Sequence, residues 1–237
     1  MDQSLGILLL TALSIGFIHT ILGPDHYIPF IAMAKAGEWS KIKTVIVTVL
    51  AGIGHVMSSI LLGFIGIALG LALNILEDIE SMRGDFAGWA LITFGLIYFI
   101  WGLRRAFKNK KHSHWHKHPE GVVHDHEHSH KSEHAHVHEE SASSKITPWV
   151  LFTIFVFGPC EALIPLLMYP AANSGIFEVV LVSTVFGVST ILTMLTIVMV
   201  ALYGFQFVPI EKFNKYSHAA AGLLILISGL SVQVLGL

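Results

Sequence analysis

The sequence predicts an all-α polytopic membrane protein whose six transmembrane helices form two inverted three-helix repeats. Hydrophobic residues make up 54% of the 237 residues and charged residues only 13%, whereas a soluble domain carries about 25% charged residues. Several apolar runs are long enough to cross a bilayer. Two of these runs are interrupted by the same dipeptide, at Gly23-Pro24 and at Gly158-Pro159.

Each apolar run is expected to be helical, because a bilayer core offers no water to unpaired backbone groups. The first and fourth spans should break at their Gly-Pro pairs, since proline has no N–H to donate to the preceding turn. The expected spans are roughly residues 5–36, 43–73, 86–103, 148–172, 176–205 and 216–237. The expected domains are a first three-helix repeat over 1–103, a loop over 104–147 and a second three-helix repeat over 148–237.

The two halves show an internal repeat. The stretch GPDHYIPF from Gly23 is similar to GPCEALIPL from Gly158, and 29 residues separate Gly23 from Gly52, as they separate Gly158 from Gly187. Because each half contributes three spans, an odd number, the second half must run through the membrane in the opposite direction. Inverted repeats with broken helices near mid-membrane are typical of transporters.

The basic residues predict the orientation. If residues 104–145 are cytoplasmic, every Lys and Arg except Arg83 lies on the cytoplasmic side, as the positive-inside rule requires. The acidic stretch EDIE at 77–80 then lies outside. We therefore expect a multi-pass protein of the plasma (inner) membrane, with both termini outside and the loop cytoplasmic. The net charge of −2 argues against a nucleic-acid partner, which leaves the lipid bilayer and a metal cation as the expected partners.

Ionisable residues from different spans lie at one depth. Asp25 is ten residues before Lys35, and His55 is twelve residues after Lys43. These separations place both side chains roughly 15 to 18 Å from the inner face of a hydrocarbon core about 30 Å thick. Ionisable residues inside a membrane are costly and usually functional. The candidate metal ligands at this depth are His19, Asp25, His26, His55, Cys160 and Glu161.

The chemistry of these residues suits a cation. Imidazole and carboxylate ligands favour a divalent transition metal, nickel or cobalt first, with zinc or iron as alternatives. The competing interpretation is structural: His19 could serve as a hydrogen-bonding residue between helices, and Cys160 could pack as a small hydrophobe. We find no nucleophile–base pair and no cofactor motif, so we expect no catalytic or cofactor-binding residues and no enzyme.

The segment 104–145 is rich in histidine. It contains eleven of the fifteen histidines, mixed with Asp, Glu, Ser and Lys, and it has few apolar residues, so we expect disorder. Histidine-rich tracts commonly bind metal, and the alternative is a flexible linker whose charge depends on pH. The candidate metal-collecting residues are His112, His114, His116, His118, His124, His126, His128, His130, His134, His136 and His138.

Several stretches resemble the nickel/cobalt efflux transporters, within the wider superfamily that includes lysine exporters and membrane thiol-electron carriers. They are HTILGPDH, AKAGEWSKIKTV, GIGHVMSSI and the histidine-rich loop, all within about the first 140 residues. The resemblance implies that His19, Asp25, His26 and His55 are metal ligands or pathway residues. The nickel-uptake pattern of the same group has one fewer residue between the first His and the Asp-His pair. In the second half, GPCEALIP resembles the thiol-carrier branch, whose helices each bring a cysteine.

The predicted function is transport of a divalent transition-metal cation, with efflux in exchange for protons, because metal binding to His and carboxylate groups displaces protons. Metal uptake is one alternative, and a non-transporting membrane accessory protein for metalloenzyme assembly is another. A thiol-electron carrier would need two cysteines, and the chain has only Cys160. An exporter of a small anion would need Lys or Arg at mid-membrane, where we expect none.

Overall fold

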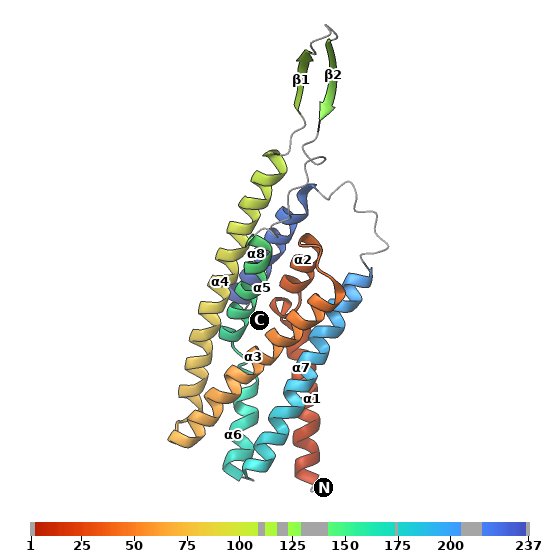
Figure 1. Ribbon diagram of the computed structural model, residues 1–237. Helices are drawn as coiled ribbons and strands as arrows, with labels where there is room; N and C mark the ends of the chain where they lie inside the picture. Colours follow the sequence, from red (N-terminus) through yellow and green to blue (C-terminus); the bar gives the residue numbers. More distant parts are fainter. Residues whose placement is uncertain are drawn as a thin grey trace.

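The computed structural model describes residues 3–108, 112–117, 123–128, 142–173, 175–204 and 215–235. Most of these residues form an elongated bundle of helices, with a two-stranded hairpin at one end (Figure 1). The elements are α1 (Gln3–Leu22), the 3₁₀ turn η1 (Pro24–His26), α2 (Ile28–Ala36), α3 (Lys41–Leu69), α4 (Leu73–Lys108), β1 (His112–Lys117), β2 (Val123–His128), α5 (Ala142–Phe157), α6 (Leu163–Asn173), α7 (Ile176–Gly204) and α8 (Ser217–Leu235).

The expectation of a helical, multi-pass membrane protein is confirmed. In the described part of the chain, five helices are long and apolar enough to span a membrane: α1, α3, α4, α7 and α8. The expected span 148–172 consists instead of two shorter apolar helices, over residues 148–157 and 163–173. Large hydrophobic side chains such as Leu10, Trp89 and Phe177 are exposed on the outside of the bundle, as contact with lipid requires.

Both expected helix breaks are present. α1 ends at Leu22, and the chain passes through Gly23 and the turn η1 before α2 continues. The second break lies between Phe157, the last residue of α5, and Leu163, the first of α6. At this break, the Gly158 N–H donates to the Phe155 carbonyl at 3.0 Å, and the Leu163 N–H donates to the Cys160 carbonyl at 2.9 Å. Each break therefore leaves non-helical backbone inside the bundle.

The third expected span is longer than predicted. The structure has one continuous helix from Leu73 to Lys108, where we expected a span over 86–103. Glutamate, leucine and methionine are good helix formers, so the acidic stretch after Leu73 continues the helix. Arg83, which we expected in an external loop, sends its side chain into the bundle and contacts carbonyl groups at the end of α5.

Helices α4 and α8 pack with their backbones in contact. Gly95 and Gly102 of α4 face α8, and Gly222 and Gly229 of α8 face α4. A Cβ atom on Gly95 would lie 2.4 Å from the backbone nitrogen of Leu226. Small residues at such an interface allow membrane helices to approach closely.

The other helices pack in pairs across the bundle. Among the described elements, α1 packs against α7, and α3 packs against both α5 and α7. The half-helix α2 contacts α8, and the half-helix α6 contacts α4 as well as α3 and α7. Phe30 of α2, Phe155 of α5 and Met194 of α7 form one of the buried clusters where these helices meet.

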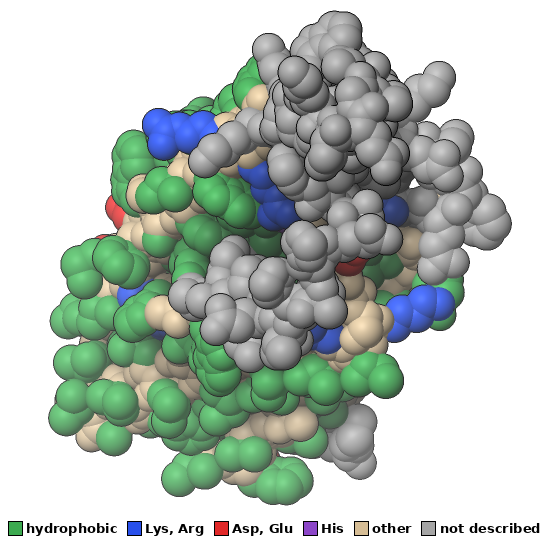
Figure 2. All heavy atoms as spheres, turned by 45° about the horizontal axis from the view of Figure 1, so that its top comes forward, with side chains coloured by type: hydrophobic (Ala, Val, Ile, Leu, Met, Phe, Trp, Pro, Cys, Tyr) green, Lys and Arg blue, Asp and Glu red, His purple; other side chains and the backbone are tan. Residues whose placement is uncertain are grey.

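Part of the expected loop has regular backbone structure. Within 104–147, α4 continues to Lys108, α5 starts at Ala142, and β1 pairs with β2 in an antiparallel hairpin. Its register places His112 opposite His128, His114 opposite His126, and His116 opposite His124. His118, His130, His134, His136 and His138 lie outside the described residues, where disorder stays a prediction. Figure 2, turned toward the hairpin end, shows Lys and Arg side chains gathered on that face above a largely hydrophobic surface.

Candidate metal site

Three histidines from separate elements meet inside the bundle. His19 lies near the end of α1, His26 ends η1, and His55 lies in the middle of α3. One ring nitrogen from each lies within 4.8 Å of those of the other two. The ring centroids of His19 and His26 are 4.7 Å apart, and those of His26 and His55 are 5.1 Å apart. These are the only three His, Cys, Asp or Glu residues of the described chain that form such a group.

The break after α1 creates this meeting. The chain turns at Gly23 and Pro24, so the ring of His26 folds back beside that of His19 at an interplanar angle of 83°. A Cβ atom on Gly23 would lie 2.4 Å from Nδ1 of His26. Glycine is therefore required here by the close approach of the His26 ring to the backbone.

The Nδ1 atoms of two of the histidines face hydrogen-bond acceptors. Nδ1 of His26 lies 3.1 Å from Oδ1 of Asp25 and 3.2 Å from the Gly23 carbonyl. Nδ1 of His55 lies 3.3 Å from the Phe155 carbonyl. A carbonyl oxygen can only accept, so each Nδ1 carries the proton of a neutral ring and Nε2 keeps a free lone pair. This is the tautomer that a metal-binding imidazole needs.

The Nε2 atoms of all three histidines are buried, and none has a hydrogen-bond partner among the described residues. A buried polar atom without a partner costs about 1–3 kcal/mol. Three such nitrogens lie together, and two of them are held in the tautomer that leaves the Nε2 lone pair free. They are electron-pair donors, and no group among the described residues binds those lone pairs. A cation is the simplest common partner for them.

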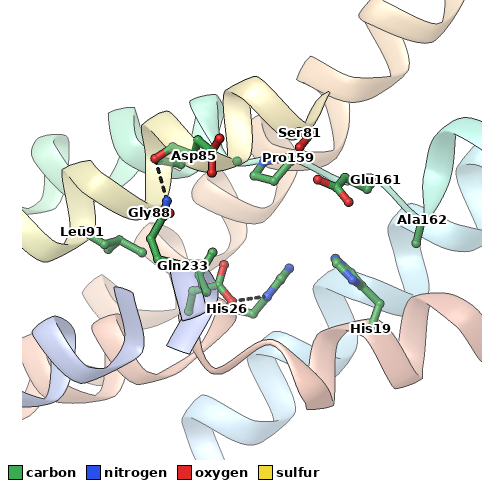
Figure 3. Close-up of a pocket in the computed structure, with 14 residues that line it drawn as sticks. His19, His26, Ser81, Asp85, Gly88, Leu91, Pro159, Glu161, Ala162 and Gln233 are labelled. Carbon is green, nitrogen blue, oxygen red and sulfur yellow. Dashed lines mark hydrogen bonds and ion pairs between the residues drawn. The ribbon is translucent and has the colours of Figure 1, made fainter. Parts of the chain in front are cut away.

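A cavity of about 400 Å³ reaches this cluster. His19 and His26 lie on one side, and Glu161 and Pro159 lie on the opposite side (Figure 3). Asp25 also lines the cavity, as do Ser81, Asp85, Gly88 and Gln233. His55, which is 2% exposed, does not line the cavity, and its ring lies next to that of His26. The cavity therefore gives access to the cluster through His19 and His26.

The remaining predicted site residues are not part of the three-histidine group. Asp25 lies beside His26 and binds its Nδ1 atom. Glu161 lines the cavity across from the histidines. Cys160 is fully buried in a hydrophobic cluster with residues such as Leu163. Of the loop candidates, the structure describes only backbone, at six positions in β1 and β2.

The sequence did not reveal a buried polar network beside the site. It contains Glu80 and Arg83 of α4, Ser58 and Ser59 of α3, and the backbone at the second break. Glu80 is fully buried and pairs with Arg83 one turn further along the helix. The spacing i, i+3 of an acidic and a basic residue was the one available signal, but the surrounding charges indicated an exposed loop.

One comparison with known proteins gave a match. The family described as "Cytochrome C biogenesis protein transmembrane region" matches residues 28–231, a range that includes His55, Cys160 and Glu161. No curated protein and no solved structure matches the chain. The inferred resemblance to the nickel/cobalt efflux transporters is therefore wrong: it rested on short motifs, two of which contain only a few polar residues in apolar surroundings. Since the family match covers most of its length, the chain belongs to the family of the cytochrome C biogenesis protein transmembrane region.

Proposed function

We propose that this protein is a membrane accessory protein that holds a transition-metal ion on His19, His26 and His55 and passes it on during metalloprotein assembly. One observation carries the proposal: three Nε2 atoms are buried together without a partner among the described residues. The acceptors at Nδ1 of His26 and His55 support it, because they leave both Nε2 lone pairs free.

The geometry is close to what a metal would need. Ligand atoms around a tetrahedral ion with bonds of about 2.1 Å lie about 3.4 Å apart, so small ring movements would close the present group, whose atoms lie within 4.8 Å. Three protein ligands leave a fourth position open, as in sites that exchange a ligand. In this proposal the open position faces the cavity. Three imidazoles suit nickel, cobalt, zinc or iron, and no enzymatic step is involved.

The family makes an assembly role the nearer interpretation. Its description names the biogenesis of a cytochrome, which is a protein that contains iron. A dithiol–disulfide cycle within this chain would need two cysteines, and Cys160 is the only one. We therefore propose that the histidine cluster supplies the chemistry in place of a cysteine pair.

We also propose that the bundle consists of two inverted repeats and crosses the membrane six times, with α5 and α6 together forming one crossing. The packing supports this division, because each of two helix–helix contacts between the halves has a counterpart when the first and second halves are interchanged. The contact of α1 with α7 corresponds to that of α5 with α3, and the contact of α2 with α8 corresponds to that of α6 with α4. The two halves run in opposite directions through the bundle (Figure 1).

The basic residues support an orientation in the plasma membrane with the hairpin in the cytoplasm and both termini outside. Lys35, Lys41 and Lys43 are near the ends of α2 and α3 that lie toward the hairpin (Figure 1). The positive-inside rule assigns such an end to the cytoplasm. In this orientation, the hairpin histidines could collect ions on the cytoplasmic side.

Transport of the same ion across the membrane, as efflux in exchange for protons or as uptake, is a second candidate. The observation that favours it is the cavity that reaches from the surface to a cluster between two broken helices. The two functions differ in one measurement. Purified protein in liposomes would carry a divalent ion across the membrane if it were a transporter, whereas an accessory protein would bind the ion without net flux.

The metal site can be tested in the full-length chain with the eleven loop histidines replaced by glutamine, called here the loop-substituted chain. We expect one equivalent of Co²⁺ or Ni²⁺ to bind per chain, measured by calorimetry and by the absorption of bound Co²⁺. His26→Ala should lower the affinity at least about tenfold, because it removes one of three ligands. His218→Ala is the matched control, since His218 pairs with Tyr98 away from the cluster. Equal affinities in the two variants, or no binding by the parent, would contradict the proposal.

A further inference from the structure

We infer that Arg83 and Glu80 are positioning residues for the histidine site: they hold the second helix break so that the Phe155 carbonyl meets Nδ1 of His55. The inference rests on the proposed function, because it concerns how one ligand of that site is oriented. Neither residue belongs to the three-histidine group, and neither lines the cavity among the residues described.

Arg83 binds the backbone where α5 ends. Its Nη2 atom donates to the carbonyls of Val156 and Gly158, at 3.1 and 3.2 Å. These carbonyls lie near the end of a helix that stops inside the bundle, where backbone groups need a partner. The Phe155 carbonyl, which accepts from His55, belongs to the same turn. Arg83 therefore fixes the turn that carries the acceptor of His55.

Arg83 also contacts the α3 side of the hydrogen bond between His55 and the Phe155 carbonyl. Its Nη2 atom donates to Oγ of Ser58 at 2.7 Å, and the same Oγ donates to the His55 carbonyl at 2.7 Å. One guanidinium thus links the backbone of α3 at His55 with the end of α5. The planar fork of arginine suits this task, because it binds several acceptors in a fixed geometry.

Glu80 completes the arrangement. It is fully buried, and its carboxylate accepts from Arg83, from Oγ of Ser59 at 3.1 Å, and from the Cys160 N–H at 2.9 Å. It therefore neutralises Arg83 and binds the first free N–H after the break at Pro159. Together the pair satisfies acceptors on one side of the break and a donor on the other.

This arrangement has a consequence for the tautomer of His55. If the Phe155 carbonyl moved away, Nδ1 of His55 would lose its acceptor, and the proton could occupy Nε2 instead. A protonated Nε2 cannot bind a metal. Loss of the Arg83 contacts should therefore weaken metal binding even though no ligand has been removed, as orienting groups behind metal-binding histidines generally do.

The test uses the loop-substituted chain labelled with ¹⁵N-histidine, in which only His19, His26, His55 and His218 contribute signals. Arg83→Lys keeps the charge but loses the fork, and Ser58→Ala removes the hydroxyl that links Arg83 to the His55 carbonyl. Ser231→Ala is the matched control, because it removes a similar hydroxyl-to-carbonyl bond from the exposed side of α8. The readouts are the tautomer of His55 without metal, the affinity for Co²⁺ and the absorption spectrum of bound Co²⁺.

We expect Arg83→Lys and Ser58→Ala to increase the Nε2-protonated fraction of His55 and to lower Co²⁺ affinity about 10–100-fold, with Ser231→Ala unchanged. If both variants keep the parent tautomer and affinity, the inference is wrong. If Arg83→Lys does not fold, Ser58→Ala decides alone. If the parent binds no Co²⁺ but the tautomer still changes, the proposed function fails while the positioning role stands.

Discussion

Gly52 of α3 and Gly187 of α7 face each other's helices at the crossing of α3 and α7. A Cβ atom on Gly52 would lie 3.1 Å from Cγ1 of Ile191, and one on Gly187 would lie 3.0 Å from Cγ1 of Val56. The two glycines occupy equivalent positions in the proposed repeat, 29 residues after Gly23 and Gly158. Each glycine therefore contacts the helix that carries the other, and Gly52 lies one turn before His55 in α3.

The first prediction concerns this crossing. Gly187→Leu should destabilise the folded protein by about 1–3 kcal/mol, because the added side chain meets Val56 in a packed interface. Gly204→Leu is the control in the same helix, since a Cβ there would meet nothing within 4 Å. Unfolding in a denaturing detergent would measure both. Equal stabilities for the two variants would show that the crossing is loosely packed.

The second prediction concerns the carboxylate behind His26. Asp25→Asn should lower the affinity of the loop-substituted chain for Co²⁺ about tenfold, because the neutral amide orients Nδ1 of His26 less strongly. Asp78→Asn, an equal change of charge on an exposed residue of α4, should leave the affinity unaltered. A loss of several thousandfold in Asp25→Asn would instead indicate that Asp25 is itself a ligand.

The depth argument placed Asp25 and His55 at one level of the membrane, because rise per residue fixes depth in a membrane helix, and the structure brings His19, His26 and His55 together. It could not predict what each side chain does at that depth. Asp25 turns toward the neighbouring His26 because the 3₁₀ turn brings the two together. Cys160 faces an apolar cluster instead of the histidines. Both outcomes depend on local turn geometry that a depth count does not contain.

Glu80 and Arg83 show a different limit of the sequence. Charged residues next to an apolar run usually mark the end of a membrane span, so the stretch before residue 86 was predicted to lie outside. The structure buries Glu80 completely because the broken helix beside it offers unpaired carbonyls and an N–H. The buried pair of Glu80 and Arg83 is stabilised by backbone groups of another segment that have no helical hydrogen bonds. Its burial therefore depends on two distant parts of the chain.

The third prediction concerns the histidine-rich loop. Deleting residues 112–138, which include all eleven loop histidines, should reduce the number of metal ions bound per chain but leave one site of unaltered affinity. The reason is that the three-histidine group is built entirely from α1, η1 and α3. Equilibrium dialysis at several metal concentrations measures both quantities. Loss of the last site in a correctly inserted deletion variant would show that the loop helps to form it.

The fourth prediction concerns pH. Metal affinity of the loop-substituted chain should rise with pH below neutrality and become constant above it, because a protonated imidazole cannot bind a metal and protons compete with the ion. The change should approach about tenfold per pH unit for each proton displaced. Calorimetry in buffers of different ionisation enthalpy would count the protons. Binding without proton release at low pH would contradict ligation by histidine.

The last prediction assigns a role to Glu161. It lies across the cavity from His19 and His26 (Figure 3) and does not belong to the three-histidine group. Its carboxylate and that of Asp85 line the same cavity, so together they create a negative potential along the access to the histidines. A potential of one sign in a cleft raises the association rate of an oppositely charged ion by about tenfold or more. Glu161→Gln should therefore slow Co²⁺ association up to about tenfold at low salt and leave dissociation unchanged.

Stopped-flow absorption of Co²⁺ would measure both rates, with Glu178→Gln as a control of equal charge at the start of α7. The effect should nearly vanish in 1 M salt, where the Debye length falls to about 3 Å. A role as fourth ligand would give a different result, because dissociation would then become faster and the effect would persist in salt. A role as proton carrier, which the exchange mechanism requires, would alter the pH dependence of flux in liposomes more than either rate constant. The three roles therefore differ in which measured quantity changes, and one substitution separates them.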